Sequence, residues 1–367
     1  MSTPPYRVPT MAEVRAVPWN GFNAISTFSG CGGSSLGYRM AGFRVLWASE
    51  FVPAAADTYR ANAAPYTHLD TRDVREVTAE DILESTGLKV GEIDLMDGSP
   101  PCSPFSTSGT RERGWDVVKR YSDKAQRVDD LFFEFIRLVA ALRPRTFVAE
   151  NVSGLVKGTA KGYFKLILAG LREAGYRVEA RLLDSQWLGV PQRRQRLIFV
   201  GVRDDLGMDP VHPKPLPFAY TVADAIGDLP GAYDDLQHDP ETGHPLSFRG
   251  YSIEKLWHGM KPGTGHPERL NLKRMSWSAP CQTIVATAGV SGTSSITHPS
   301  HPRYPSLQEL RRIGGFPDDF TLTGGFARRW ERIGRAVPPV MMARIAAAVR
   351  DEVLVPLRKA GTIPCAE

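Results

Sequence analysis

Short apolar segments alternate with amphipathic ones through the first half of the chain, and this alternation constrains the fold more than any other feature. Six segments have the length and composition of strands: 24–29, 45–50, 93–98, 146–151, 178–183 and 196–202. Two segments between them, 131–144 and 163–176, place apolar residues at helical spacing, and Gly175 can cap the second. The alternation predicts an α/β fold with a parallel sheet and helices on both faces.

The character of the sequence changes after about residue 204. Residues 204–300 are rich in Pro, Gly, His and Asp and lose long helical periodicity, which predicts a second, smaller and irregular domain. From Ser306 onward the chain is helical again. We therefore expect four parts: an N-terminal extension over 1–20, the main domain over 21–203, the second domain over 204–300, and a return to the main domain over 301–367.

Composition excludes several classes of protein. No apolar run approaches the roughly 18 residues that a membrane helix requires, and the N-terminus lacks the apolar core of a secretory signal. The four cysteines are far apart with no CxxC pair, which disfavours a zinc site or a disulfide framework and is typical of a reducing cytoplasm. A net charge of +5 permits a polyanionic partner but does not establish one.

The segment "TFSGCGGSSLGYRMAGF", residues 27–43, follows the first strand and opens a helix. Gly30, Gly32 and the helix N-terminus allow a ligand to approach the backbone closely. Glu50 ends the second strand, where a carboxylate commonly binds a ribose diol. Because the motif departs from GxGxxG spacing, we expect an adenosine cofactor other than NAD. Asp73 could accept a hydrogen bond from an adenine amino group or could simply cap a turn.

A single cysteine stands in the stretch "DGSPPCSPFSTSG", residues 97–109, directly after a predicted strand. Pro100 and Pro101 each fix a φ angle, so Cys102 is presented on a stiff turn rather than packed within a sheet. The basic segment 111–127 follows and can favour the reactive thiolate. We interpret Cys102 as a nucleophile; an inert buried cysteine is the alternative.

A nucleophile of this kind requires a partner that manages protons. Glu150 and Asn151 end the next predicted strand, and burial there would raise the pKa of Glu150 enough for it to donate a proton near neutrality. Along "QRRQR", residues 192–196, strand alternation would point Gln192, Arg194 and Arg196 to one face. A structural carboxylate and a solvated basic turn are the alternatives.

Together these motifs resemble the cytosine-C5 DNA methyltransferase family in its linear order. "FSGCGG" is similar to the family's cofactor loop and "GSPPCSPFS" to its catalytic motif, and "ENV" and "QRRQR" follow in the expected sequence. "LQELRRIGGFPDDF" and "IGRAVPPVMMARIA" resemble its last conserved block. The resemblance covers about residues 23–203 and 270–350. It implies a Rossmann-like methyltransferase sheet in 21–203, with a target-recognition domain in 204–300.

The resemblance also implies the activity and the roles of individual residues. S-adenosylmethionine would donate a methyl group to C5 of a cytosine flipped out of double-stranded DNA, with Cys102 attacking C6 and Glu150 protonating or hydrogen bonding N3. Arg196, supported by Arg194 and Gln192, would orient the base. The implied cofactor contacts are Phe28, Gly30, Gly32, Glu50, Phe51, Asp73, Val74 and Pro101. The implied DNA contacts are Ser106 and Ser108 in a mobile loop, with Asn151 and Arg274.

A monomer acting in the bacterial cytoplasm at the nucleoid is expected, with no metal ion. A cognate restriction endonuclease could act on the same site without forming a stable complex. Arg335 stands where the family's last block has asparagine, and Ser29 where its cofactor loop has alanine. A tRNA methyltransferase on the same scaffold, an inactive DNA-binding relative and a nicotinamide oxidoreductase are the alternatives. The Cys-Phe-Thr tripeptide associated with the tRNA methyltransferases is absent from this sequence. A nicotinamide oxidoreductase would not explain "PPC", "ENV" and "QRRQR".

Overall fold

The computed structural model describes residues 3–101, 118–121, 124–127, 131–156, 160–269, 272–286 and 296–364. The chain divides into two compact units. The sheet unit comprises 14–183, 195–214 and 342–367, and the loop-rich unit comprises 1–13, 184–194 and 215–341. This division differs from the expected boundaries, because segments 184–194 and 301–341 make their contacts within the loop-rich unit. Every helix within the described ranges is too short or too polar to cross a membrane.

The sheet unit is built on seven strands in the order β3-β2-β1-β4-β7-β9-β8. Their bounds are β1 Asn23–Thr27, β2 Arg44–Ser49, β3 His68–Asp70, β4 Leu95–Gly98, β7 Thr146–Val152, β8 Tyr176–Asp184 and β9 Gln195–Arg203. The pairs β2·β3, β1·β2, β1·β4 and β4·β7 are parallel, whereas β9 is antiparallel to β7. The predicted α/β fold with a mostly parallel sheet is therefore confirmed, and β9 is the exception to parallel pairing. A short connection without a crossover helix precedes β9, and parallel pairing requires such a crossover.

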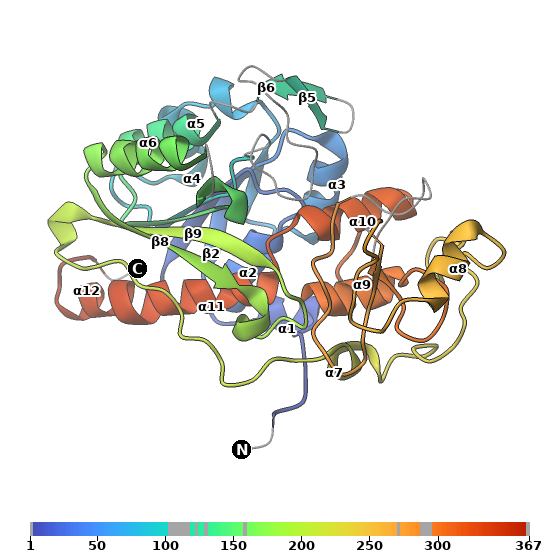
Figure 1. Cartoon of the computed structure of the whole chain (residues 1–367). Helices are drawn as coiled ribbons and strands as arrows, with labels where there is room; N and C mark the ends of the chain where they lie inside the picture. The colour runs from blue at the N-terminus through green and yellow to red at the C-terminus, as the bar shows by residue number, and fades with distance from the viewer. Residues whose placement is uncertain are drawn as a thin grey trace. The chain divides into compact units, whose positions relative to one another are not determined.

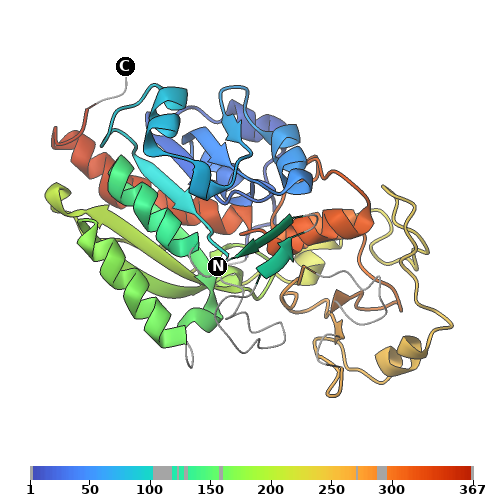
Figure 2. The same cartoon turned by 90° about the horizontal axis from the view of Figure 1, so that it is seen from above.

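Side-chain alternation gives the sheet one apolar face and one face with polar residues at its centre. Ile25, Met96 and Phe147 are register partners on three neighbouring strands and belong to the main core. Figure 1 shows α5 and α6 on one side of this sheet and α12 on the other, and Figure 2 shows α5 and α6 side by side. The helices of the sheet unit are α2 Gly33–Met40, α3 Pro53–Asn62, α4 Ala79–Thr86, α5 Leu131–Leu142, α6 Ala160–Glu173 and α12 Val355–Lys359.

The loop-rich unit has short elements and a small core of its own, which includes Phe248, Trp257 and Leu272. A buried Arg303–Glu309 pair, with two N···O distances of 2.9 Å, anchors the start of α9. Its helices are α7 Val222–Ile226, α8 Ser252–His258, α9 Leu307–Gly314 and α10 Phe326–Arg335. Two further helices, α1 Met11–Ala16 and α11 Pro339–Val349, each span a boundary between the units. Two short strand pairs complete the structure: β5 Val118–Tyr121 with β6 Lys124–Arg127, and β10 Lys273–Arg274 with β11 Ile296–Thr297.

Candidate active site

The predicted cofactor residues follow three parallel strands at their carboxyl ends. The glycine loop follows β1, Glu50 follows β2, and Asp73 lies three residues beyond the end of β3. The Pro100–Pro101 turn follows β4, which pairs with the other side of β1. Because these strands are parallel neighbours, their ends share one edge of the sheet. The strand order reverses between β1 and β4, which is where ligands bind in open α/β sheets.

The glycine loop has an unusual backbone that leaves room for a ligand. Phe28 has φ +54°, a left-handed conformation that costs a non-glycine residue about 1–2 kcal/mol. Hydrogen bonds to Ser49 from the Ser29 N–H (2.9 Å) and the Phe28 N–H (3.4 Å) hold this conformation. Gly30 has φ +57°, and a Cβ built on it meets no described atom within 4 Å. The loop therefore presents its backbone to open space.

Glu50 organises this loop from the end of β2. One carboxylate oxygen accepts from the Gly30 N–H at 2.8 Å and the other from the Val52 N–H at 2.7 Å. A carboxylate oxygen has a second lone pair, so each can also accept from a ribose hydroxyl. Phe51 beside it is half-buried. The arrangement fits the predicted ribose contact while tying the loop to the neighbouring strand.

Asp73 is a cap in this structure. Its Oδ1 accepts from the Arg75 N–H at 3.1 Å at the start of the 3-10 turn Val74–Glu76, and its Oδ2 lies 3.2 Å from Arg75 Nη1. Val74 is buried beneath the turn. The turn fixes the carboxylate near the end of β3, and its contact with an adenine amino group stays a prediction. Two ordered carboxylate acceptors and an open glycine loop suit the hydroxyl and amino groups of an adenosine cofactor.

Glu150 and Arg196 form an ion pair, with Oε1 and Nε 2.5 Å apart. The antiparallel register places Arg196 opposite Val152, so Glu150, two residues earlier on β7, faces the same side. Their side chains are only 12% and 15% exposed. The structure thus brings together two predicted catalytic residues that are separated in sequence. A charge-assisted contact of this kind fixes the orientation of both groups.

Gln192 and Arg194 have a different environment from Arg196. Strand β9 begins only at Gln195, but burial alternates along the whole motif: Gln192 and Arg194 are buried and Arg196 is half-buried, whereas Arg193 and Gln195 are exposed, in keeping with the predicted alternation. Gln192 and Arg194 are both 2% exposed and lie in the loop-rich unit. Arg194 donates to the Ile284 and Gly334 carbonyls at 3.0 and 2.9 Å, and Gln192 accepts from the Ile284 N–H at 3.2 Å. These contacts join separate segments of that unit.

Asn151 links the end of β7 to the turn that precedes the predicted nucleophile. Its Nδ2 donates to the Pro100 carbonyl at 3.3 Å, and its Oδ1 accepts from the Val152 N–H at 2.8 Å. The side chain is 2% exposed, so these contacts position the turn. Pro101 is half-buried. The predicted site residues Cys102, Ser106 and Ser108 lie outside the described residues.

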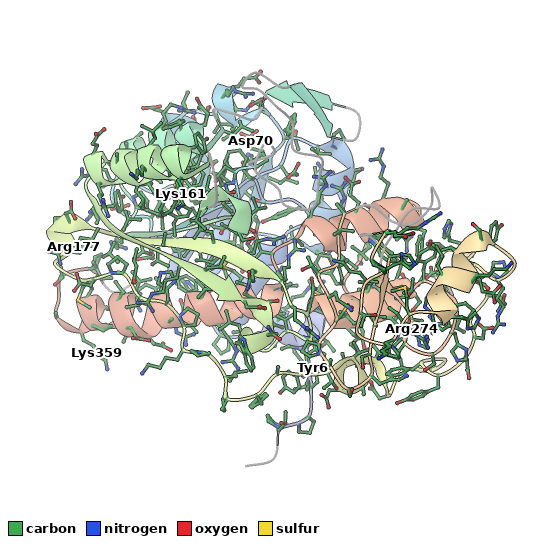
Figure 3. The ribbon with its side chains drawn as sticks, viewed as in Figure 1. Tyr6, Asp70, Lys161, Arg177, Arg274 and Lys359 are labelled. Carbon is green, nitrogen blue, oxygen red and sulfur yellow. The ribbon has the colours of Figure 1, made fainter. Side chains whose placement is uncertain are left out.

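Two arginines named in the sequence analysis, Arg274 and Arg335, form hydrogen bonds with nearby residues of the structure. Arg274, labelled in Figure 3, donates to the carbonyls of Pro299 (2.9 Å) and Met260 (3.1 Å) and stacks over the Trp257 ring at 3.8 Å. Arg335 donates to Glu331 one turn earlier on α10, at 2.8 Å. The first contact set positions the guanidinium within the loop-rich unit, and the second is a partly exposed helix pair.

Sequence reasoning gave no role to Asp97, which is 1% exposed on β4. It accepts hydrogen bonds from Ser26 and Tyr38, on the two elements that the glycine loop joins. An acidic residue inside an otherwise apolar strand is the signal that could have drawn attention to it.

Comparison with known proteins gave matches over most of the chain. The sequence model of the C-5 cytosine-specific DNA methylase family matches residues 22–351. The type II methyltransferase M1.HphI of Haemophilus parahaemolyticus is 29% identical over 338 residues, which cover 89% of this chain and 86% of the relative. The type II methyltransferase M.PspPI of Psychrobacter sp. is 30% identical over 362 residues, which cover 92% of this chain and 81% of the relative.

Solved structures share the fold. A putative DNA modification methyltransferase from a prophage of E. coli superposes with a TM-score of 0.71 at 23% identity, covering 91% of this chain and 99% of that one. The Dnmt2 methyltransferase of S. pombe superposes with a TM-score of 0.60 at 14% identity, covering 92% and 99% of the two chains. At these identities the likeness is one of architecture.

Proposed function

Because this chain belongs to the C-5 cytosine-specific DNA methylase family, we propose that it methylates DNA cytosine at C5 through a covalent adduct on Cys102. The activity itself, sequence-specific and S-adenosylmethionine-dependent methylation of DNA cytosine, follows from the family and from the type II methyltransferase relatives. The proposal concerns the residues that perform it. The observation that carries it is the Glu150–Arg196 pair: Glu150 lies on β7, next to the strand β4 that leads into Cys102, and Arg196 lies on β9, on the other side of β7.

Cys102 is a better candidate for the nucleophile than the two cysteines that the structure describes. Its reactive form is the thiolate, and it directly follows the proline turn that Asn151 holds. Cys31 and Cys281 are 3% and 0% exposed, and burial raises the pKa of the Cys281 thiol well above its ordinary value. A thiol that stays protonated and excluded from solvent is a poor nucleophile. Cys102 Sγ would form a bond to C6 of the cytosine.

Glu150 would manage the proton that this addition requires. Bond formation at C6 pushes negative charge into the ring, and Glu150 would donate a proton or a hydrogen bond to N3 to stabilise it. Arg196 would orient Glu150 and offer its other N–H groups to the base. S-adenosylmethionine, when bound, supplies an electrophilic methyl group that C5 of the activated ring can take. Transfer of the C5 proton to a base, cleavage of the Sγ–C6 bond with its electrons returning to sulfur, and return of the N3 proton to Glu150 would then release 5-methylcytosine and the thiolate.

The residues at the carboxyl ends of β1, β2 and β3 would hold the cofactor. The Glu50 carboxylate would accept from the ribose hydroxyls and Asp73 from the adenine amino group. Phe28, which the strained loop presents, would pack against the adenine ring. Gly30 leaves the space that the ligand requires. Gly32, Phe51, Val74 and Pro101 are the further contacts that the resemblance implies.

The proposed contacts with DNA follow from the position of the target cytosine inside a duplex. A cytosine must leave the duplex to reach a thiol, and extruding it costs a few kcal/mol that contacts to phosphates can offset. The loop-rich unit would read the recognition sequence. Ser106 and Ser108, which belong to a different segment, would lie in the loop that closes over the DNA. We further propose a monomer that acts at the bacterial nucleoid, alongside a restriction endonuclease of the same specificity without a stable complex.

Replacement of Cys102 by serine tests the nucleophile. The Cys102→Ser protein should bind DNA but transfer no labelled methyl group, and it should form no adduct with a duplex containing 5-fluorocytosine. Cys281→Ala is the matched control, because that thiol is buried and should leave activity and adduct formation intact. Mass spectrometry of the trapped parent protein should place the adduct on Cys102. Full activity of Cys102→Ser would reject the assignment.

Sequencing of methylated cytosines distinguishes DNA from RNA as the substrate. In a host that expresses the parent protein, 5-methylcytosine should accumulate in genomic DNA within one short sequence context. The Cys102→Ser protein should leave that DNA unmodified. Modification confined to tRNA would favour the alternative on the same scaffold, and light scattering of the purified protein would test the proposed monomer.

A further inference from the structure

A buried hydroxyl–carboxylate cluster lies directly beneath the glycine loop. Asp97 on β4 accepts from Ser26 Oγ on β1 at 2.8 Å and from Tyr38 Oη on α2 at 2.9 Å, with a different carboxylate oxygen for each. All three side chains are at most 1% exposed. Ser26 and Asp97 are register partners in the sheet, so the alternation of both strands places them side by side. Both elements that flank the loop, β1 and α2, are thus tied to the strand that leads into the nucleophile turn.

The cluster extends into the loop itself. Ser29 Oγ donates to the Ser26 carbonyl at 2.8 Å and lies 3.0 Å from Ser26 Oγ. Ser29 is the position where the sequence departs from the alanine of related cofactor loops. A hydroxyl there allows the loop to join the cluster, which alanine could not do. The chain from Asp97 through Ser26 to Ser29 therefore connects β4 to the loop by side-chain hydrogen bonds.

We propose that Asp97 is a positioning residue for cofactor binding, whose carboxylate fixes the glycine loop against the catalytic strand. The inference rests on the proposed cofactor site, but it assigns to this site a residue that touches neither the cofactor nor the base. Two hydroxyl donors to one ionised carboxylate are strong, directional contacts. Loss of these hydrogen bonds would allow the loop to relax from the left-handed backbone conformation that Phe28 adopts.

The ionisation of Asp97 should govern this function near neutral pH. Burial raises the pKa of this carboxyl to about 7, the Glu150 charge acts in the same direction, and the hydrogen bonds from Ser26 and Tyr38 oppose it. The titratable groups that face it are Tyr38 on α2, Tyr59 on α3 and Glu150 on β7. Protonation would turn one acceptor oxygen into a donor that competes with the two hydroxyl groups. The loop would then be held less firmly below pH 7 than above it.

Calorimetric binding of S-adenosylhomocysteine between pH 6 and pH 8.5 tests the proposal without turnover. For the parent protein, Kd should fall about tenfold as pH rises through 7, the effect expected of one charge-assisted hydrogen bond. Asp97→Asn should bind with the weaker, low-pH affinity and show no such transition. Tyr38→Phe keeps the carboxylate, so it should retain the transition but shift it to higher pH, because a bond that stabilises the ionised form is lost.

Asp94→Asn is the matched control, since Asp94 is a buried acid directly before the same strand, bonded to the Asn23 N–H at 2.8 Å and paired with Arg145. It should leave the pH transition of binding unchanged. A parent protein that binds the ligand with a Kd constant over this pH range would overturn the inference alone. So would an Asp97→Asn protein that keeps the parent's transition, whereas a parent that binds no S-adenosylhomocysteine at any pH would reject the proposed cofactor site itself.

Discussion

Removing the charge of Asp97 should also change how the stability of the protein depends on pH. The carboxyl is 1% exposed, and burial raises its pKa to about 7. In the unfolded chain an aspartate has a pKa of about 3.9. At a pH between these two pKa values, the Asp97 carboxyl is deprotonated in the unfolded chain but still protonated in the folded protein. The free energy of unfolding therefore falls as pH rises through this window and levels off above pH 7.

The size of the effect follows from the width of the window. Each pH unit in which one proton separates the two states changes the free energy of unfolding by about 1.4 kcal/mol. From pH 5 to pH 7 the contribution of Asp97 should thus decrease by roughly 2–3 kcal/mol. The Asp97→Asn protein has no such proton. Relative to the parent, it should gain that amount between pH 5 and pH 8, whatever constant offset its altered hydrogen bonds introduce.

Urea unfolding followed by circular dichroism at pH 5, 6, 7 and 8 measures this difference. Subtracting the two proteins at each pH cancels the contributions of all other titrating groups. Asp205→Asn is a suitable control, because Asp205 is 54% exposed and its pKa is lowered by hydrogen bonding to Arg203. A group with a lowered pKa loses its contribution only as pH falls below about 4, so this control should show no trend. A constant difference between Asp97→Asn and parent would mean that Asp97 is ionised throughout, and the reasoning would fail.

Three further changes test the site and the packing around it. Glu150→Gln should slow single-turnover methyl transfer by about 10²–10⁴-fold, as loss of a general acid does, while S-adenosylhomocysteine binding is kept; a rate within twofold of the parent would remove Glu150 from the mechanism. Arg196→Met leaves a buried carboxylate without its cation and should cost about 3–5 kcal/mol in urea unfolding, most of which Glu150→Gln in the same protein should restore. Gly201→Ala should destabilise by about 1–3 kcal/mol, because its Cβ would lie 2.0 Å from the Phe147 ring. Gly162→Ala, in open space on α6, is its control and should be neutral or stabilising.

The strands and the main helical core could be predicted from local pattern. All six expected strands are present with boundaries within two residues. Five of them are mostly buried runs, whereas β8 is mainly half-buried or exposed. The apolar stripe of 131–142 is buried along α5 as its spacing predicts. Strand β3 gave no such signal, since only Leu69 is apolar between His68 and Asp70. Local pattern identifies an element when the element itself carries enough apolar surface.

Strand direction and hydrogen-bond partners depend on contacts that local pattern does not contain. The antiparallel course of β9 follows from the connection after β8, and it is this course that brings Arg196 beside Glu150. Asp73 was expected to contact a ligand, with a cap as the alternative, and in the structure it accepts from the N–H of Arg75. The proposed role of Asp97 depends on hydrogen bonds from two hydroxyl groups, one on β1 and one on α2, and local pattern does not predict these partners. Position along a strand was predictable, whereas the identity of the partner was not.

The "QRRQR" motif shows why a sequence motif need not have a single physical role. Within five residues the chain passes from the loop-rich unit, which ends this segment at Arg194, to the sheet unit, which resumes at Gln195. Arg194 supports the backbone of Ile284 and Gly334, and a Cβ on Gly334 would lie 2.5 Å from the Val285 carbonyl oxygen. That close approach requires glycine at position 334, and Arg194 links the two segments by donating to a carbonyl of each. Loss of activity on replacing Arg194 would therefore report on the packing of the loop-rich unit, whereas loss on replacing Arg196 would report on Glu150.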